Sequence, residues 1–183
     1  MSSIIKVDTI QTAAGGTPTA GDLGLNITGS VIQVTQAFSG SRFTGGSGNT
    51  WHETNCTHSI TPILNNSKFM CQFHQNFRFY ANGGTIFRGG IRLKRRIAGG
   101  AWTILTNSTG HRETFQTRTP SSTLQELGNV FSGSFLDEPV HNGSLVEYIL
   151  EANMTVDSGS AANSVISWEG DRGNFMNILE IAG

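Results

Sequence analysis

Apolar and polar side chains alternate over one long segment of this chain. Between residues 68 and 79 the apolar side chains of Phe69, Cys71, Phe73, Phe77 and Phe79 share one parity. Polar side chains occupy positions of the other parity, at Lys68, Gln72, His74, Asn76 and Arg78. A period of two over this length predicts a β-strand with one face in a hydrophobic core.

The same alternation returns twice downstream. After the turn sequence Asn82-Gly83-Gly84, the segment Thr85 to Ile97 alternates Phe87, Ile91, Leu93 and Ile97 with Arg88, Arg92, Lys94 and Arg96. We therefore predict a β-hairpin with the preceding strand. In Leu145 to Val156, apolar residues from Val146 to Val156 form one face, opposite Glu147, Glu151, Asn153 and Thr155.

Shorter strands are predicted throughout the rest of the chain. They cover Val31–Phe38, Trp51–Ile63 as a pair or as one bent strand, Trp102–Leu105, Glu113–Gln116, Asn129–Leu136, Ser164–Trp168 and Asn174–Ala182. The glycine-rich Ser39–Asn49 and the weakly helical Pro120–Leu127 are interpreted as loops. Roughly eight to ten strands without a convincing helix predict an all-β, antiparallel β-sandwich or jelly roll.

The first thirty residues differ from this domain. They contain no aromatic residue and too little apolar surface to fold alone, so we expect an extended arm, residues 1–30, before a β-sandwich domain at 31–183. An extended arm can add a strand to the sheet edge of another chain. The residues expected to anchor it are the aliphatic ones: Ile4, Ile5, Val7, Ile10, Leu23, Leu25 and Ile27.

Composition narrows the range of partners. The chain has 183 residues, 23 glycines and a net charge of −1, so no overall field attracts nucleic acid or an anionic membrane. The N-terminus lacks the apolar core of a signal peptide, and no run is long enough for a membrane span. We expect synthesis in a cytoplasm with Cys56 and Cys71 reduced, and these two cysteines form neither a disulfide framework nor a zinc signature.

Catalytic patterns are missing from the sequence. The five histidines are scattered, and no nucleophile elbow, zinc-hydrolase motif or phosphate loop occurs. Asp137 and Glu138 are adjacent, so in a strand they point to opposite faces and cannot flank one glycosidic bond. We therefore predict a non-enzymatic protein with no catalytic residue, no metal site and no cofactor.

Basic residues are concentrated in the middle of the chain, where eight of the twelve Lys and Arg residues lie between Arg78 and Arg118. Four of them share one face of a predicted strand: Arg88, Arg92, Lys94 and Arg96. This stripe suits an anionic ligand, but a charged solvent face that prevents sheet-edge aggregation is the favoured interpretation. Arg95 has the core-facing parity, which indicates a bulge or an ion-paired site near a subunit interface.

Several short motifs resemble one group of proteins. They are Ile5–Gln11, Asp22-Leu23-Gly24, Gly29–Val34, Ser59–Pro62, Phe135–Pro139 and Ile178–Ala182. Together they resemble tail-fibre and other virion-appendage proteins of marine bacteriophages, cyanophages especially. Two departures stand out, because Glu138 occupies a position where the corner motif often has Ser, and no long repetitive shaft separates the arm from the first strand.

The resemblance implies a homotrimer of jelly rolls similar to the tumour-necrosis-factor type. The arm would then bind another virion protein of the tail or capsid, and outer loops would meet the host surface, with a surface glycan as one candidate ligand. We therefore expect a short trimeric tail fibre or knob, made in the bacterial host cytoplasm and placed on the virion, with no nucleic-acid partner and no membrane insertion. The alternatives are a capsid decoration protein or head fibre and, with less support, a glycan depolymerase.

Overall fold

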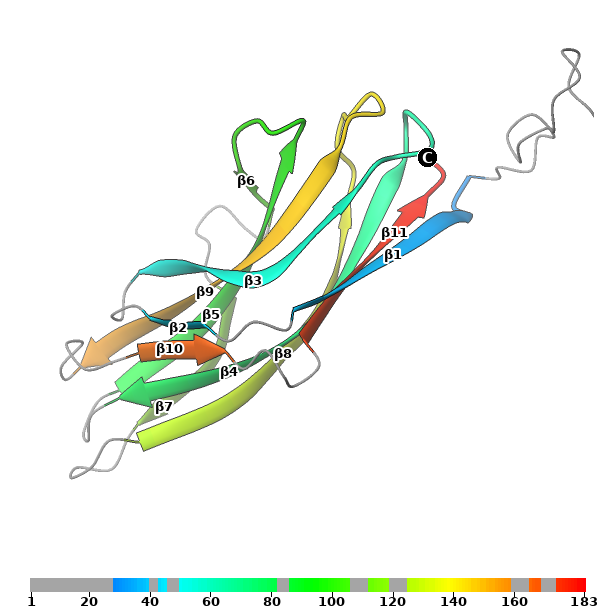
Figure 1. Cartoon of the computed structure of the whole chain (residues 1–183). Coiled ribbons are helices and arrows are strands. Elements are labelled where there is room, and N and C mark those ends of the chain that lie inside the picture. Colours follow the sequence, from blue (N-terminus) through cyan, green and yellow to red (C-terminus); the bar gives the residue numbers. More distant parts are fainter. Residues whose placement is uncertain are drawn as a thin grey trace, which may run out of the picture.

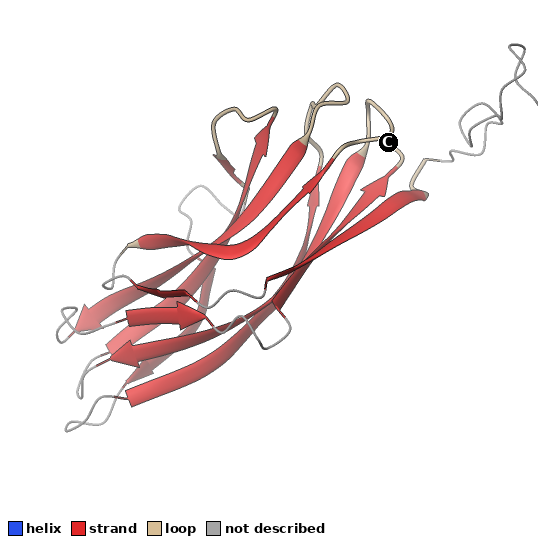
Figure 2. Ribbon diagram, viewed as in Figure 1, coloured by secondary structure: helices blue, strands red, loops and turns tan. Residues whose placement is uncertain are grey.

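Two antiparallel β-sheets pack face to face in the computed structural model (Figure 1). The structure describes residues 28–39, 43–45, 50–81, 86–105, 112–118, 125–158, 165–168 and 174–183. None of these residues is helical (Figure 2). The all-β class predicted from the alternating pattern is confirmed.

Sheet A is built around the long strand β4 (Lys68–Ala81). Strand β8 (Gln125–Asp137) pairs with one edge of β4 along its whole length. The other edge pairs in turn with β11 (Asn174–Ile181) and β10 (Val165–Trp168). Outside these lie β1 (Val31–Ser39) against β11 and β2 (Phe43–Gly45) against β10.

Sheet B has β9 and β5 at its centre. Strand β9 (Val146–Ser158) lies between β3 (Trp51–Ile60) and β5 (Ile86–Ile97). The far edge of β5 pairs with β6 (Thr103–Ile104) and with β7 (Arg112–Arg118) at successive positions. Each sheet is therefore about four strands wide.

The strand order is that of a jelly roll. If β1 with β2, β6 with β7, and β10 with β11 are each taken as one interrupted strand, every connection crosses to the other sheet except the turn between β5 and β6. Two Greek keys folded over each other produce this order. The predicted hairpin between Lys68–Phe79 and Thr85–Ile97 is wrong, because β4 and β5 lie in different sheets and do not pair.

Core packing follows the predicted parity. The side chains of β4 at Phe69, Cys71, Phe73 and Phe77 are buried, and they face Leu93 of β5 and its neighbours across the sandwich. Tyr148, Leu150 and Ala152 of β9 and Met176 and Ile178 of β11 complete the centre of this cluster. Burial of such side chains contributes about 1.5–3 kcal/mol each to folding.

Trp51–Ile60 forms one bent strand, one of the two arrangements predicted for that segment. Its pairing with β9 shifts register between Glu53 and Thr57. The buried Thr54 lies at this bulge, where its hydroxyl donates to the Leu150 carbonyl at 2.8 Å and accepts from the Cys56 amide at 3.1 Å. The side chain thus satisfies backbone groups that the bulge leaves without a ladder partner.

Two predicted loops contain strand residues. Phe43–Gly45, inside the glycine-rich stretch, forms β2. Gln125–Leu127, interpreted as loop, belongs to β8 and pairs with Phe79, Tyr80 and Ala81. Neither strand segment could be predicted from local composition, because long-range pairing with β10 and with β4 overrides the weak local preference for a loop.

A buried ion pair joins the two sheets. Arg95 of β5 donates from Nη1 to Oδ1 of Asp137 in β8 at 2.7 Å, and the Tyr148 hydroxyl of β9 donates to Oδ2 at 2.8 Å. Asp137 has 5% of its surface exposed. Of the two alternatives predicted for Arg95, a bulge or an ion-paired site, the structure has the ion pair. The partner, Asp137, belongs to the same chain.

The first described residues and the C-terminus lie side by side at one end of the sandwich. Gly29 donates its amide to the Ala182 carbonyl at 2.8 Å, and Ala182 donates back to the Ser30 carbonyl at 2.9 Å. We call this the arm end. Residues 1–27, with all seven predicted anchoring residues, lie outside the described residues.

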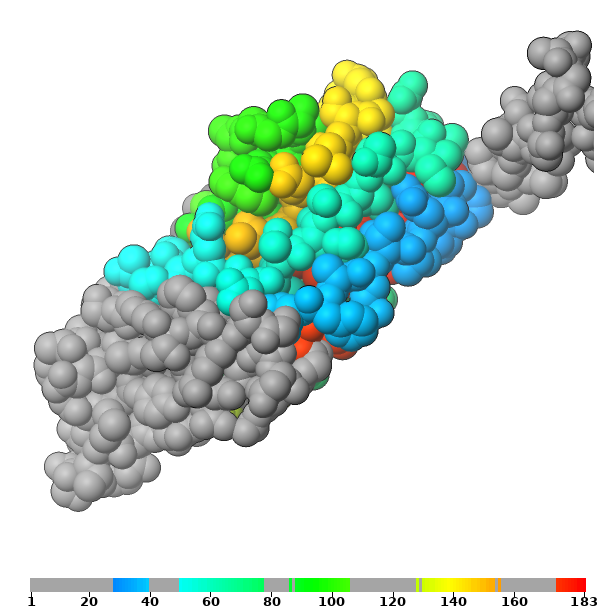
Figure 3. All heavy atoms as spheres, in the orientation of Figure 1, coloured from blue at the N-terminus to red at the C-terminus, as the bar shows by residue number. Residues whose placement is uncertain are grey.

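At one side of the sandwich the two sheets meet along β1 and β3. Figure 3 shows β1 in blue and β3 in cyan as neighbouring strips of one face. Gln33 of β1 donates to the Thr61 carbonyl, just beyond β3, at 2.9 Å. This contact closes the sandwich near the arm end.

Candidate functional site

The outer face of sheet B carries a ladder of opposite charges. Arg92, Lys94 and Arg96 occupy alternate positions of β5, and the register places Arg92 opposite Glu151 and Arg96 opposite Glu147 of β9. Opposite charges that lie directly across two antiparallel strands stabilise the pair. We call the three cations with Glu53, Glu147 and Glu151 the charged ladder.

The ladder is closely paired. Arg92 donates from Nε to Glu151, and Lys94 lies with Nζ 2.7 Å from the same carboxylate and 3.5 Å from Glu53. Arg96 binds Glu147 through Nε and Nη2, both at 2.7 Å. The hydrogen bond from Arg96 lowers the pKa of Glu147, and the same bond raises the pKa of Arg96.

Two tryptophans flank the ladder. The Arg92 guanidinium lies 4.3 Å from the Trp51 ring centre, and the Arg96 guanidinium lies 4.6 Å from that of Trp102. Lys94 approaches Trp102 at 5.3 Å. Such cation–π contacts hold the cations in place, and the layer covers Ile149, which points outward from β9 yet is 7% exposed.

The predicted basic stripe is therefore only part of this face. Arg92, Lys94 and Arg96 lie on it together, and Arg88 precedes them on β5 opposite Thr155. Sequence reasoning missed the three carboxylates and both indoles. Glu147 and Glu151 already shared a parity, but the register that sets them against Arg96 and Arg92 cannot be read from either strand alone.

The outer face of sheet A has an opposite character. Direct pairing aligns side chains of four strands in three rows across the sheet. One row is apolar, with Val34, Leu179, Met70 and Leu136. The next is polar, with Gln36, Asn177, Gln72 and Ser134.

The third row is aromatic and contains Phe38, Phe175, His74 and Ser132. The Phe38 and Phe175 rings are 6.4 Å apart, His74 stacks on Phe175 at 5.5 Å, and its Nδ1 lies 2.8 Å from the Ser132 hydroxyl. We call the three rows the banded face. These rows contain no Asp, Glu, Lys or Arg. Two of their apolar side chains are largely exposed, Val34 at 60% and Phe38 at 70%.

Exposed apolar side chains of this size on a sheet face usually mark a contact with another protein. Leu136 at 44% exposure extends the apolar row to β8, the edge strand opposite β1. The banded face is thus uncharged and partly apolar, whereas the outer face of sheet B is covered by its own ion pairs. Sequence reasoning had identified the strands but did not single out this face.

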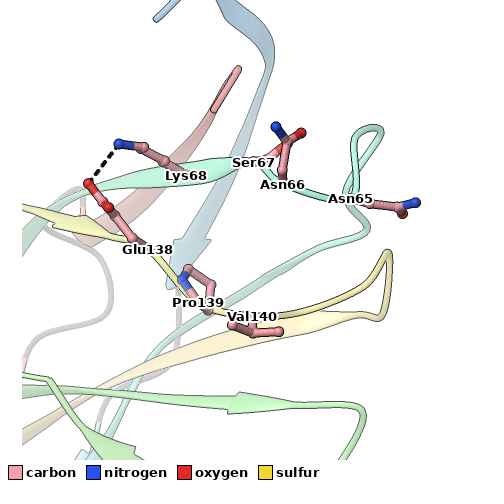
Figure 4. A pocket seen from close by; sticks show the side chains of 7 residues that line it. All are labelled: Asn65, Asn66, Ser67, Lys68, Glu138, Pro139 and Val140. Atoms are coloured by element: carbon pink, nitrogen blue, oxygen red, sulfur yellow. Dashed lines mark hydrogen bonds and ion pairs between the residues drawn. The ribbon is translucent and has the colours of Figure 1, made fainter. Parts of the chain in front are cut away.

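A shallow hollow of about 330 Å³ lies at the arm end (Figure 4). Lys68 and Glu138 form one side and are joined by a 3.0 Å ion pair, drawn as a dashed line. Val140, which is 82% exposed, lies beside Pro139 on the rim. The Asp137–Glu138 pair thus separates as predicted, with Asp137 in the core and Glu138 at the surface.

The loop that follows β3 is held by a buried carboxylate. Glu180 of β11 accepts hydrogen bonds from the amides of Ile63 and Leu64, from the Ser67 hydroxyl and from Gln33 Nε2 at 2.6 Å. Burial alone would raise the pKa of Glu180, but these hydrogen bonds outweigh it and lower the pKa. We call this arrangement the Glu180 clasp.

Neither the thiols nor the histidines form a reactive group in the described ranges. Burial raises the pKa of Cys56 to about 12 and also raises that of Cys71, so both thiols stay protonated. Burial lowers the pKa of His58. Among the described residues, no group of three or more His, Cys, Asp or Glu side chains could hold a metal ion. The described part of the chain also contains no helix that is long and apolar enough to cross a membrane.

Comparisons with known proteins identify no family. No family model matches the chain, and no curated protein matches it. The search of solved structures matches a chain in the structure of infectious bursal disease virus, Gx strain, with 9% sequence identity and a TM-score of 0.35. That match covers 81% of this chain and 36% of the viral chain, so this chain spans about a third of the length of the protein it resembles.

Proposed function

We propose that this chain is a structural protein of a bacteriophage virion, a short trimeric tail fibre or knob that attaches the particle to the host surface. The observation that carries the proposal is the banded face, an uncharged sheet surface with exposed Val34, Phe38 and Leu136 on an otherwise well-paired jelly roll. Such a face exposes apolar surface to water, which is unfavourable unless the face packs on another protein.

A second copy of the chain suits the banded face better than a charged partner does. In a closed trimer the three copies of one face surround the threefold axis, so a face with net charge would repel the equivalent faces of the other two copies. The banded face carries no formal charge, and its apolar and polar rows can each meet rows of like character. The neutral, layered pattern therefore favours self-assembly over docking to nucleic acid or to an acidic partner.

The arm end fits a tether to the particle. Gly29 and Ser30 pair with Ala182, so residues 1–27 are joined to the jelly roll at this end. Ile63 at 61% and Val140 at 82% exposure add apolar side chains to the same surface. Repeated copies directed away from a particle would gain avidity for a host surface from weak individual sites.

Electron microscopy of purified particles tests the proposal. Gold-labelled antibody raised against the jelly roll is expected to mark the tail, and antibody absorbed with the pure protein serves as the control. Label over the head shell would favour the capsid decoration protein or head fibre instead. Particles without label, while other virion proteins label normally, would contradict a virion role.

A further inference from the structure

The banded face contains a single group that can gain a charge in weak acid. His74 of β4 is the one histidine of its three rows, and these rows contain no Asp, Glu, Lys or Arg. An imidazole takes up a proton as the pH falls through about 6.5. The charge of this face therefore changes from zero to one positive charge per copy in weak acid.

His74 is held on the sheet by contacts within its own chain. Its ring stacks on Phe175, with ring centres 5.5 Å apart and 8° between the ring planes, and its Nδ1 lies 2.8 Å from the Ser132 hydroxyl. The side chain is half-buried, and its Nε2 has no hydrogen-bond partner among the described residues. In a separate chain this nitrogen is therefore left to water.

We propose that His74 makes self-assembly through the banded face dependent on pH, so that the trimer forms at neutral pH and separates into single chains in weak acid. The inference rests on the proposed function, because it requires copies of the banded face to meet. In a closed trimer the three copies of the aromatic row surround one axis, so each protonated imidazole would face two others.

The covered face would oppose protonation in two ways. Packing against other copies removes water from Nε2, and a charge taken out of water without a partner is strongly unfavourable. Three like charges around one axis also repel one another. The Ser132 hydroxyl can turn to accept a hydrogen bond from a protonated Nδ1, but one hydroxyl cannot also serve Nε2.

The contact with Phe175 does not change this balance. A protonated imidazole is attracted to the face of an aromatic ring, and that attraction favours the charged form. Phe175 belongs to the same chain as the His74 that it contacts, so the attraction is present before and after assembly. It therefore cancels from the difference between the separate chain and the trimer.

The strands beside β4 place no carboxylate next to the imidazole. Strand β1 contains no ionisable residue, and the one in β11, Glu180, is buried in the clasp. In β8, Asp137 lies in the core and Glu126 is opposite a β4 residue six positions from His74. None of these groups can neutralise a proton on His74.

The charged residues of β4 itself are also distant. Arg78 lies four positions from His74, about 13 Å along the strand. Lys68 lies six positions away in the other direction and is paired with Glu138. A charge on His74 would therefore stand alone in an otherwise uncharged interface.

Proton linkage gives the sign and the size of the effect. Because the separate chain binds the proton more readily than the trimer, the trimer is fully favoured above about pH 6.5 and loses stability as the pH falls below it. Three protons enter per trimer, so the trimer dissociation constant should rise by up to about a thousandfold per pH unit. Glu147 and Glu180, with pKa values lowered from 4.5, stay largely ionised at pH 5.5.

Sedimentation equilibrium of the full-length protein at pH 7.5 and at pH 5.5 tests the inference, with circular dichroism to check the fold. The parent should have the mass of three chains at pH 7.5 and of one chain at pH 5.5. His74→Phe keeps a ring against Phe175 and His74→Gln keeps a polar group, and both should remain trimers at both pH values. His58→Gln, in β3 of sheet B, is the control and should respond to pH as the parent does.

The outcomes separate this inference from the proposed function. A parent that is a trimer at both pH values would overturn the inference alone. A parent that is a single chain at pH 7.5 would contradict self-assembly itself. If His74→Phe and His74→Gln separate at pH 5.5 as the parent does, another group causes the response and the role of His74 is overturned.

Discussion

Asp137 and Arg95 join the two sheets through a 2.7 Å ion pair in the interior of the sandwich. Asp137 is the last residue of β8 in sheet A, and Arg95 points inward from β5 in sheet B. The Tyr148 hydroxyl donates to the second carboxylate oxygen. The pair therefore fixes how the two sheets lie on each other at this point, where the rest of the core is held by non-directional apolar contacts.

Removal of one member of this pair leaves a buried charge without its partner. We expect Arg95→Met to lower the free energy of unfolding by about 3–5 kcal/mol. The double variant Arg95→Met with Asp137→Leu removes both charges and should lose clearly less than the two single variants together. Urea unfolding curves measure each value, and an Arg95→Met protein as stable as the parent would refute the structural role of the pair.

Gly133 in β8 leaves room for the ring of Phe73. A Cβ at Gly133 would lie 3.0 Å from Cζ of that ring, whereas a Cβ at Gly128 in the same strand would meet nothing within 4 Å. We expect Gly133→Val to lower the free energy of unfolding by about 1–3 kcal/mol, because a buried ring must shift. Gly128→Val is the matched control, and equal effects at both positions, measured by urea unfolding, would contradict the packing described for Phe73.

The Glu180 clasp predicts acid sensitivity of the arm end. The pKa of Glu180 is lowered in the folded protein from an ordinary value of 4.5, so the folded state favours the ionised carboxylate. The resulting stability is fully present above the unfolded pKa and is lost as the pH falls through the lower folded pKa. Glu147, whose pKa is also lowered, adds to the loss in the same range of pH.

Glu180→Gln separates the contribution of the clasp from that of Glu147. The variant cannot ionise, so it should be less stable than the parent at pH 7, by about 1–3 kcal/mol, and its stability should depend less on pH between 7 and 3. Glu138→Gln, at an exposed ion pair, is the control with little expected effect. Thermal unfolding across this range measures both, and parallel pH curves for parent and Glu180→Gln would exclude the clasp.

Alternation along the chain predicted which side of each strand faces the core. Phe69, Cys71 and Phe73 of β4 and Leu93 of β5 are buried as their parity required, and Arg95 proved to be ion-paired on the same inward side. Side-chain period is a local property, because successive residues of a strand point to opposite faces whatever the strand pairs with. The all-β class follows from it directly.

The strand that pairs with each edge of a given strand could not be predicted from the sequence. The turn after β4 suggested a hairpin, yet β4 and β5 lie in facing sheets, because alternation specifies a face and leaves the neighbour on each edge open. The same limit hid the charged ladder and the banded face, since both depend on register. The sequence analysis did not single out Glu180, and only the folded loop at Ile63, Leu64 and Ser67 explains its burial.

The native mass of the purified chain tests the central claim, self-assembly through the banded face, most directly. Sedimentation equilibrium at micromolar concentration should give the mass of three chains for the parent and for Val140→Glu, which alters the arm end. Leu136→Glu places a charge in the apolar row and should sediment as a folded single chain, with its circular dichroism spectrum unchanged. A parent protein with the mass of one chain, or a Leu136→Glu variant that still forms trimers, would contradict the account.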